Sequence, residues 1–234
     1  MELIWHNAKR MILLWYTCCM QGAARDSDSL SGREKAYEFL KDTILADPEM
    51  QGRFISEQDV ANQIGVSRTP IREALLLLAA EDLVQLMPKK GAYVAPLSSR
   101  QISELMELRG VVERYAAERT MSEGTVPLRQ MQELVEQQRF LVEDARQFID
   151  VDRQFHALLV AATGNELLTK TYEGLRARQV RAGVVALYRA HGRQQAVIDE
   201  HNEIVAALES GDVGAATAAI TAHLDTTLKV LLSG

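Results

Sequence analysis

Four side chains in the second half of the chain have the types and spacing of a metal site. Asp152 and His156 are four residues apart, so on a helix they lie on one face. His201 and His223 each fall within the apolar stripe of a later predicted helix. Buried imidazoles and carboxylates are costly unless they are hydrogen-bonded or coordinated to a metal. Taken singly, each histidine is more simply a hydrogen-bonded core residue, but the set of four predicts a site for Zn²⁺, Ni²⁺, Mn²⁺ or Fe²⁺ with room for a further ligand.

A second group of polar residues has the spacing of a helix that reads DNA. Arg68 and Arg72 are one helical turn apart, so both can point outward from a helix whose other face is apolar. Ser67 and Thr69 stand at the start of that helix, where hydroxyl and free N–H groups can donate to phosphate. We therefore expect one arginine to contact guanine and the other to contact phosphate in the major groove.

Lys89, Lys90 and Gly91 follow between two β-prone runs at residues 83–87 and 92–95, which predicts a hairpin with basic residues at its turn. The glycine lets the turn approach a DNA backbone closely. For any one of these charged residues, a solvated surface position is the simpler explanation.

The elements that would carry these residues divide the chain into two domains. Three short helices and the hairpin, within residues 31–96, predict a winged helix-turn-helix. Residues 97–234 predict an all-α antiparallel bundle, with helices over 98–120, 126–144, 147–163, 165–189, 193–210 and 212–232. The fold class is therefore mainly α.

Composition limits the partners. The net charge is −6, and residues 32–96 hold eight basic and ten acidic residues, so any DNA contact must come from the placement of a few charges and from dimerisation. The only cysteines are the adjacent Cys18 and Cys19, so no disulfide framework forms and a reducing cytoplasm is favoured.

Residues 1–30 are interpreted as a leader of uncertain structure. The apolar run at residues 11–16 is much too short for the roughly 20 residues that cross a bilayer, so no membrane partner is expected. A loosely attached leader, an upstream start codon and an additional packed helix all remain open.

The run Gly65-Val66-Ser67-Arg68-Thr69-Pro70-Ile71-Arg72-Glu73-Ala74-Leu75 resembles the signature of GntR-type transcription regulators, and the flanking segments at 52–57 and 90–94 resemble the family's lead-in and wing. Gln58 departs from the pattern, because family members usually carry a basic residue there. The resemblance implies a regulator, more often a repressor than an activator, that binds double-stranded operator DNA.

Residues 98–232 resemble the FCD ligand-binding domain of the FadR subgroup, in which an Asp-x-x-x-His pair and two later histidines bind metal. The subgroup also implies an effector-binding arginine on the domain's first helix, and Arg109 fits that position. A guanidinium could bridge an effector carboxylate to the metal. An intrachain ion pair with Glu113, four residues later, is the alternative.

Together these patterns predict a homodimeric, non-enzymatic regulator whose operator affinity changes when a small carboxylate binds at the metal-containing pocket. Two alternatives remain. A His₃Asp site could serve a metal-dependent hydrolase, although the motif supplies no clear extra acid or base. The bundle could also be a dimerisation unit that senses nothing.

Overall fold

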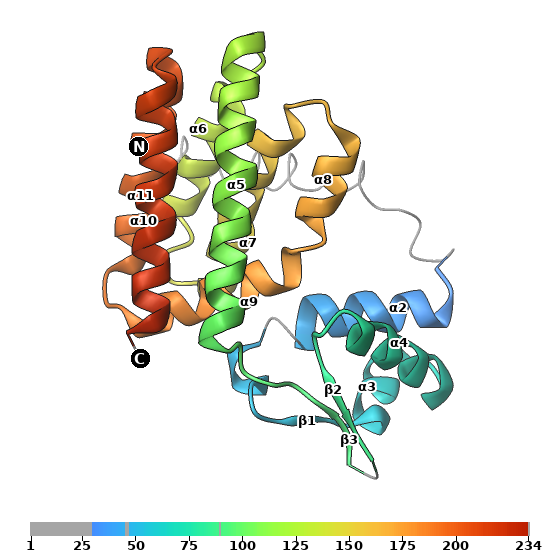
Figure 1. Ribbon diagram of the computed structural model, residues 1–234. Coiled ribbons are helices and arrows are strands. Elements are labelled where there is room, and N and C mark those ends of the chain that lie inside the picture. The colour runs from blue at the N-terminus through green and yellow to red at the C-terminus, as the bar shows by residue number, and fades with distance from the viewer. Residues whose placement is uncertain (1–29, 45–46, 89, 234) are drawn as a thin grey trace, which may run out of the picture.

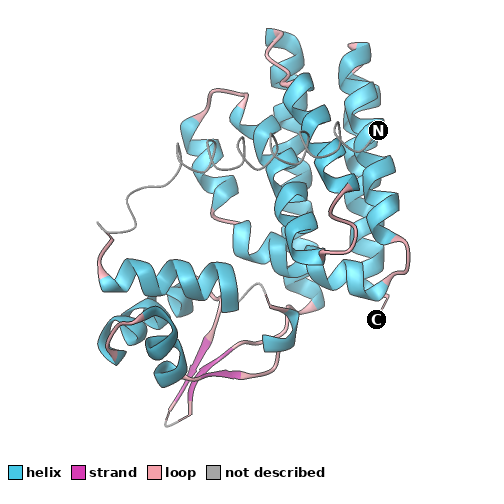
Figure 2. Ribbon diagram, turned by 180° about the vertical axis from the view of Figure 1, so that it is seen from behind, coloured by secondary structure: helices cyan, strands magenta, loops and turns pink. Residues whose placement is uncertain are grey.

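The computed structural model describes residues 30–44, 47–88 and 90–233, which form two domains (Figure 1). The strands are confined to the N-terminal domain, and the C-terminal domain is helical over the residues described (Figure 2). The predicted class, a winged helix-turn-helix followed by a helical bundle, is confirmed. The proposed leader, up to residue 29, and Lys89 lie outside the described residues.

The N-terminal domain packs its helices around one small apolar core. Ser31 and Glu34 form a capping box that starts the first helix, and Ser56 caps the second. Gly65 ends the second helix in a left-handed conformation (φ 71°), which glycine adopts without steric cost. The helical elements are α2 (Gly32–Phe39), the π-helix η1 (Leu40–Ile44), the 3₁₀-helix η2 (Pro48–Met50), α3 (Glu57–Ile64) and α4 (Arg68–Ala80).

A three-stranded antiparallel sheet completes this domain. The predicted hairpin forms from β2 (Gln85–Met87) and β3 (Gly91–Tyr93), with Leu86 opposite Ala92. The sequence analysis did not anticipate β1 (Phe54–Ile55), which pairs with the other edge of β3. Two residues are too few to show an alternating pattern, so this strand carries no periodic signal.

The C-terminal domain is an antiparallel bundle in which α5 lies beside α11 (Figure 1). Its helices are α5 (Ser99–Glu123), α6 (Leu128–Arg139), α7 (Ala145–Ala161), α8 (Glu166–Glu173), α9 (Arg176–Arg189), α10 (Arg193–Ser210) and α11 (Val213–Leu232). The prediction of one helix over 165–189 is wrong, because the chain bends at Gly174 and Leu175 between α8 and α9. Glycine is an unfavourable residue in a helix interior, which favours a break at Gly174 but does not require one, because Gly110 and Gly183 lie within unbroken helices.

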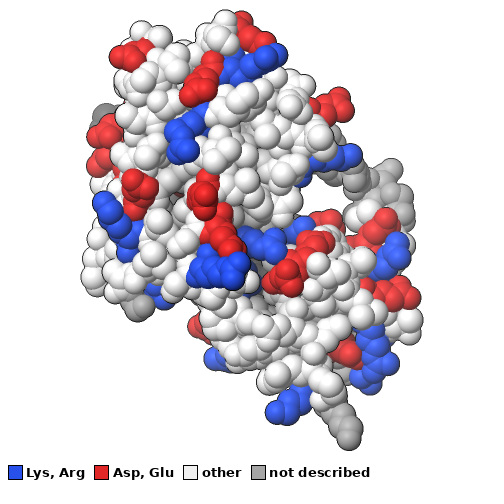
Figure 3. Space-filling view, in the orientation of Figure 1, with Lys and Arg blue, Asp and Glu red and all other residues white. Residues whose placement is uncertain are grey.

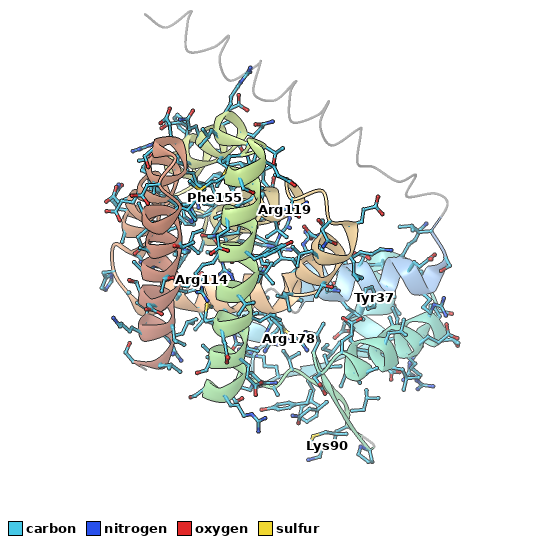
Figure 4. The ribbon with its side chains drawn as sticks, turned by 45° about the horizontal axis from the view of Figure 1, so that its top comes forward. Tyr37, Lys90, Arg114, Arg119, Phe155 and Arg178 are labelled. Atoms are coloured by element: carbon cyan, nitrogen blue, oxygen red, sulfur yellow. The ribbon has the colours of Figure 1, made fainter. Side chains whose placement is uncertain are left out.

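The helix α9 joins the two domains. Ala177 is buried in the apolar core of the winged helix-turn-helix although it belongs to α9. Arg178 donates to the main-chain carbonyl of Glu81 at the end of α4, and Arg181 Nη2 donates to the carbonyl of Ala95, 2.6 Å away, in the interdomain linker. Figure 4 shows Arg178 at this junction. The helix α9 of the C-terminal domain therefore contacts the winged helix-turn-helix domain and the linker at several points.

Candidate metal centre and DNA-reading helix

The four predicted metal ligands lie together inside the C-terminal bundle. Asp152 and His156 come from α7, His201 from α10 and His223 from α11. One potential ligand atom of each lies within 4.8 Å of the others. Nε2 of His201 is 3.3 Å from Nε2 of His156 and 3.4 Å from Oδ1 of Asp152. Residues up to 71 positions apart in the sequence thus share one polar centre within an apolar core.

Carboxylates outside the quartet orient two of the imidazoles. Nδ1 of His156 is 2.8 Å from Glu113 on α5, and Nδ1 of His223 is 2.6 Å from Glu200 on α10. An ionised carboxylate only accepts hydrogen bonds, so at these distances the proton of each imidazole is favoured on Nδ1. The lone pair of each Nε2 then faces the centre, as a metal ligand requires.

The third imidazole, that of His201, is fully buried and held from two sides. Its Nδ1 is 2.8 Å from Oε1 of Gln138, and its ring stacks on Phe155 with 4.1 Å between centroids and 12° between planes. Burial lowers the pKa of His201 well below its ordinary value, and the charges of His223 and His156 lower it further. The ring is therefore neutral, which is the form that binds metals.

The donor set fits a divalent cation. Several neutral imidazole nitrogens and a carboxylate oxygen converge on one point, and the electron pairs of such donors repel each other unless a proton or a cation lies between them. Ligands that are each about 2.0–2.2 Å from a metal lie roughly 3–4 Å from one another. The spacings of 3.3 and 3.4 Å around His201 are in that range.

Arg109 is buried beside this centre. It is 5% exposed, and its Nε donates to Glu113 at 2.7 Å, so the intrachain ion pair considered above does form. Tyr172 also donates to Glu113, at 2.6 Å. Burial raises the pKa of Glu113, but Arg109 and His156 outweigh this effect and hold that pKa well below its usual range. The ion pair uses the Nε of Arg109, which is one of its five N–H donors.

The helix α4 presents its first turn to solvent. The side chains of Arg68 and Arg72 are 52% and 61% exposed, and Ser67 and Thr69 are exposed as well. Ser67 stands at the N-cap without a side-chain capping hydrogen bond, so its hydroxyl is available to another partner. A helix start of this kind combines free N–H groups, the positive end of the helix dipole and two guanidinium groups.

One carboxylate holds both arginines. Oε2 of Glu57, the first residue of α3, is 2.9 Å from Nη2 of Arg68 and 2.8 Å from Nε of Arg72. The neighbouring Gln58 is exposed and bonds Asn62 within α3. The two arginines are therefore joined through Glu57, and the sequence analysis did not assign this residue a role.

The hairpin turn carries an exposed lysine. Figure 4 shows Lys90 at the end of the β2–β3 hairpin, away from the C-terminal domain. Gly91 has a φ of 93°, and a Cβ atom there would lie 3.4 Å from the carbonyl oxygen of Ile55. Backbone conformation is thus a reason for glycine at 91 that does not involve DNA.

Charge is mixed on the visible face of the molecule. Figure 3 shows Lys and Arg interspersed with Asp and Glu over both domains, without a continuous field of one sign. Affinity for a polyanion would therefore depend on local groups such as the start of α4. No helix among the described residues has the length and apolar character needed to cross a membrane.

Sequence reasoning missed the residues that hold the imidazoles from behind. Glu113 was considered only as a partner of Arg109, and Gln138 and Glu200 were not considered at all. A weak signal existed, since Glu200 directly precedes His201. The bond that Glu200 makes, however, crosses to His223 on another helix, so it depends on how α10 and α11 pack.

Comparison with protein families gives two matches. The family described as "Bacterial regulatory proteins, gntR family" matches residues 33–94, and the "FCD domain" family matches residues 104–226. The second match alone covers more than half of the chain.

Curated relatives are transcription regulators and not enzymes. The chain is 29% identical over 195 residues to an uncharacterized HTH-type transcriptional regulator of Streptomyces ambofaciens, covering 83% of this chain and 82% of that one. It is also 29% identical over 194 residues to the HTH-type transcriptional repressor RspR of Escherichia coli, covering 82% and 85%.

Solved structures share the fold. McbR/YncC of E. coli superposes with a TM-score of 0.74 at 24% identity, covering 87% of this chain and 98% of that one. A putative transcriptional regulator GntR from Rhodococcus sp. RHA1 superposes with a TM-score of 0.74 at 24% identity, covering 86% of this chain and 98% of that one.

Proposed function

Because the chain belongs to the gntR family of bacterial regulatory proteins and carries an FCD domain, it is a transcription regulator, and we propose that it is a repressor whose operator affinity is set by a small carboxylate bound at a metal centre. The convergence of Asp152, His156, His201 and His223 is the observation that carries the sensing half of this proposal. Such a regulator works in the cytoplasm, where the chromosome is.

The DNA-reading part of the proposal assigns α4 to the major groove. Arg68 and Arg72 contact base edges or phosphates, and Ser67 and Thr69 donate to phosphates beside the helix start. Lys90 and Gly91, with Lys89, approach the backbone from the wing. The support for these roles is exposure to solvent, because every described residue of this set is exposed except Gly91, which is partly covered.

The protein acts as a homodimer on an inverted repeat. One winged helix-turn-helix with a net charge of −2 over residues 32–96 has few cations for tight binding, so two copies that engage successive major grooves are needed. The helix α5 offers a surface for pairing, since Leu108, Val111 and Tyr115 are spaced along one side and are 39%, 56% and 44% exposed.

In the C-terminal domain, Asp152 and the three histidines would hold the divalent ion. A divalent ion held there would supply Lewis-acid affinity for a carboxylate oxygen of the effector. Arg109 binds the second oxygen of that carboxylate through its Nη groups. The charge of Arg109 acts on Asp152 and on His201, which supports a position next to the centre.

The signal then travels through α9. This helix packs on α7, which carries two of the ligands, and contacts the end of α4 through Arg178. A carboxylate that binds one relative position of the two domains better than the other shifts the population and releases the operator.

Footprinting on a selected operator tests the DNA-reading half. Purified protein selects duplexes from a randomised pool, and protection of the best duplex is measured against salt. We expect protection that weakens steeply with salt and is lost in the double variant Arg68→Ala/Arg72→Ala. The variant Arg129→Ala, an exposed arginine on α6, is the matched control. Equal protection by the wild type and the double variant would contradict the assignment.

Metal content tests the sensing half. Protein purified without chelators should contain about one divalent ion per chain, by elemental analysis, and His156→Ala should contain much less. His191→Ala removes an exposed histidine outside the quartet and should retain the metal. If the wild-type protein stays metal-free after incubation with Zn²⁺, Ni²⁺ and Mn²⁺, the sensing role is contradicted. The interpretation of the C-terminal domain as a dimerisation bundle that senses nothing would then remain.

A further inference from the structure

The carboxylate of Glu57 stands at the surface that would face DNA. It is the first residue of α3, with a side chain 18% exposed, and one of its oxygens accepts from both Arg68 and Arg72. Burial raises the pKa of Glu57, but the two arginines lower it by more, so the group is ionised at the pH of DNA binding.

An acidic group in this position opposes DNA binding on simple electrostatic grounds. It repels phosphates, and it neutralises part of the charge of two arginines in a domain that is already acidic. Stabilisation of the fold is a weak reason for it, because both arginines are more than half exposed and ion pairs with such solvated partners contribute little. The contact therefore needs an explanation in terms of what the arginines do.

Geometry supplies that explanation. Each guanidinium has five N–H donors, and Glu57 takes one from Arg68 and one from Arg72, which leaves four on each. A free arginine loses considerable rotamer entropy when it is fixed against a base, whereas an arginine that is already held loses less. Two guanidinium groups joined by one oxygen also keep a fixed spacing relative to each other.

We propose that Glu57 is a positioning residue for operator specificity. It holds Arg68 and Arg72 at the spacing at which they contact base edges, and it disfavours contacts of these arginines with phosphates. The inference rests on the proposed role of these two arginines. It predicts that Glu57 strengthens binding to the operator while it weakens binding to other DNA. A carboxylate that acts only through its charge would weaken both.

Two variants separate position from charge. Glu57→Ala removes the carboxylate, and Glu57→Asp keeps the charge but shortens the side chain by one methylene group. Glu73→Ala is the control, because it removes the same charge from the exposed side of α4 next to Arg72. Thermal unfolding of all variants checks that each is folded, and binding is measured to the selected duplex and to a scrambled duplex of equal length.

We expect Glu57→Ala and Glu57→Asp to lower the ratio of operator to scrambled-DNA affinity, on the order of tenfold, which is the scale of one lost base contact. Affinity for scrambled DNA should rise in Glu57→Ala and stay near the wild-type value in Glu57→Asp. The slope of log affinity against log salt on the operator should steepen by about 0.9 for each arginine that moves from a base to a phosphate.

A different pattern of affinities would overturn the positioning role of Glu57. If Glu57→Asp keeps the wild-type ratio and Glu57→Ala raises both affinities equally, as Glu73→Ala does, the positioning role is overturned. Failure of the underlying function has a different signature, because Arg68→Ala/Arg72→Ala would then bind the selected duplex as well as the wild type does.

Discussion

Arg178 of α9 donates a hydrogen bond to the main-chain carbonyl of Glu81, the residue at which α4 ends. The C-terminal domain thereby contacts the C-terminal end of the helix whose N-terminal end carries Arg68 and Arg72. Arg181, one turn further along α9, contacts the interdomain linker at Ala95. Burial, together with the charge of Arg178, lowers the pKa of Arg181 to about 10.

Removal of the Arg178 side chain should loosen the end of α4. A hydrogen bond from a charged donor contributes about 1.5–3 kcal/mol, so amide hydrogens near residues 81–84 should exchange roughly tenfold or more faster in Arg178→Ala. Hydrogen–deuterium exchange measures this directly. Arg119→Ala, which breaks an exposed pair with Glu123 at the far end of α5, should leave these amides unchanged. Unchanged exchange in Arg178→Ala would show that the contact does not couple the domains.

Glu200 should control metal affinity although it is not among the four ligands. It accepts from His223 at 2.6 Å and is itself paired with Arg193 at 2.5 Å. Loss of such a partner typically weakens metal binding by about 10–100-fold. Competition with a chromogenic chelator should show this for Glu200→Gln, whereas Glu203→Gln, exposed on the same helix, should bind Zn²⁺ as the wild type does. Equal affinities would mean that His223 needs no support from Glu200.

The role of Arg109 has to be tested together with a second substitution, at Glu113. Arg109→Met alone leaves Glu113 charged in a buried site, which typically costs about 3–5 kcal/mol and would confuse loss of binding with loss of folding. The double variant Arg109→Met/Glu113→Gln removes both charges. We expect it to remain folded and, with Zn²⁺ in excess so that weaker metal binding does not empty the site, to lose the rise in melting temperature that small carboxylic acids should cause in the wild type; Glu113→Gln alone, under the same conditions, should keep that rise. A retained rise would exclude Arg109 from effector binding.

Gly91 should matter for stability as well as for DNA. Its φ of 93° disfavours any side chain, so Gly91→Ala should destabilise the protein by about 1–2 kcal/mol, seen as a lower denaturation midpoint. Gly32→Ala is the control, because Gly32 has an ordinary φ and a Cβ atom there makes only normal contacts with Pro70 and Val66. If Gly91→Ala leaves the denaturation midpoint unchanged, the hairpin turn adopts another backbone conformation that accommodates the side chain.

The parts of the fold that sequence predicted are those with strong local signals. Capping serines at 31 and 56 and glycines at 65, 124 and 211 mark helix ends, and the structure has helix boundaries at each. The apolar stripes of three helices placed His156, His201 and His223 inward, where they are buried.

What sequence could not supply are the contacts between elements. The bond from Glu200 to His223, the Glu57 carboxylate between two arginines and the pairing of β1 with β3 each depend on how separate segments pack. None of them leaves a periodic pattern in the chain. The bend at Gly174 was missed for another reason, because apolar residues continue on both sides of it and imitate one long helix.

That bend has a mechanical consequence. Since α9 is bounded by Gly174 and Leu175 at one end and by Gly192 at the other, a displacement of α9 relative to α8 and α10 would require rotation about only a few backbone dihedrals. In an unbroken helix over 165–189, the same displacement would have to unwind a turn and lose several main-chain hydrogen bonds. The break between α8 and α9 thus lets the helix that contacts both domains keep its own main-chain hydrogen bonds whatever its position relative to α8.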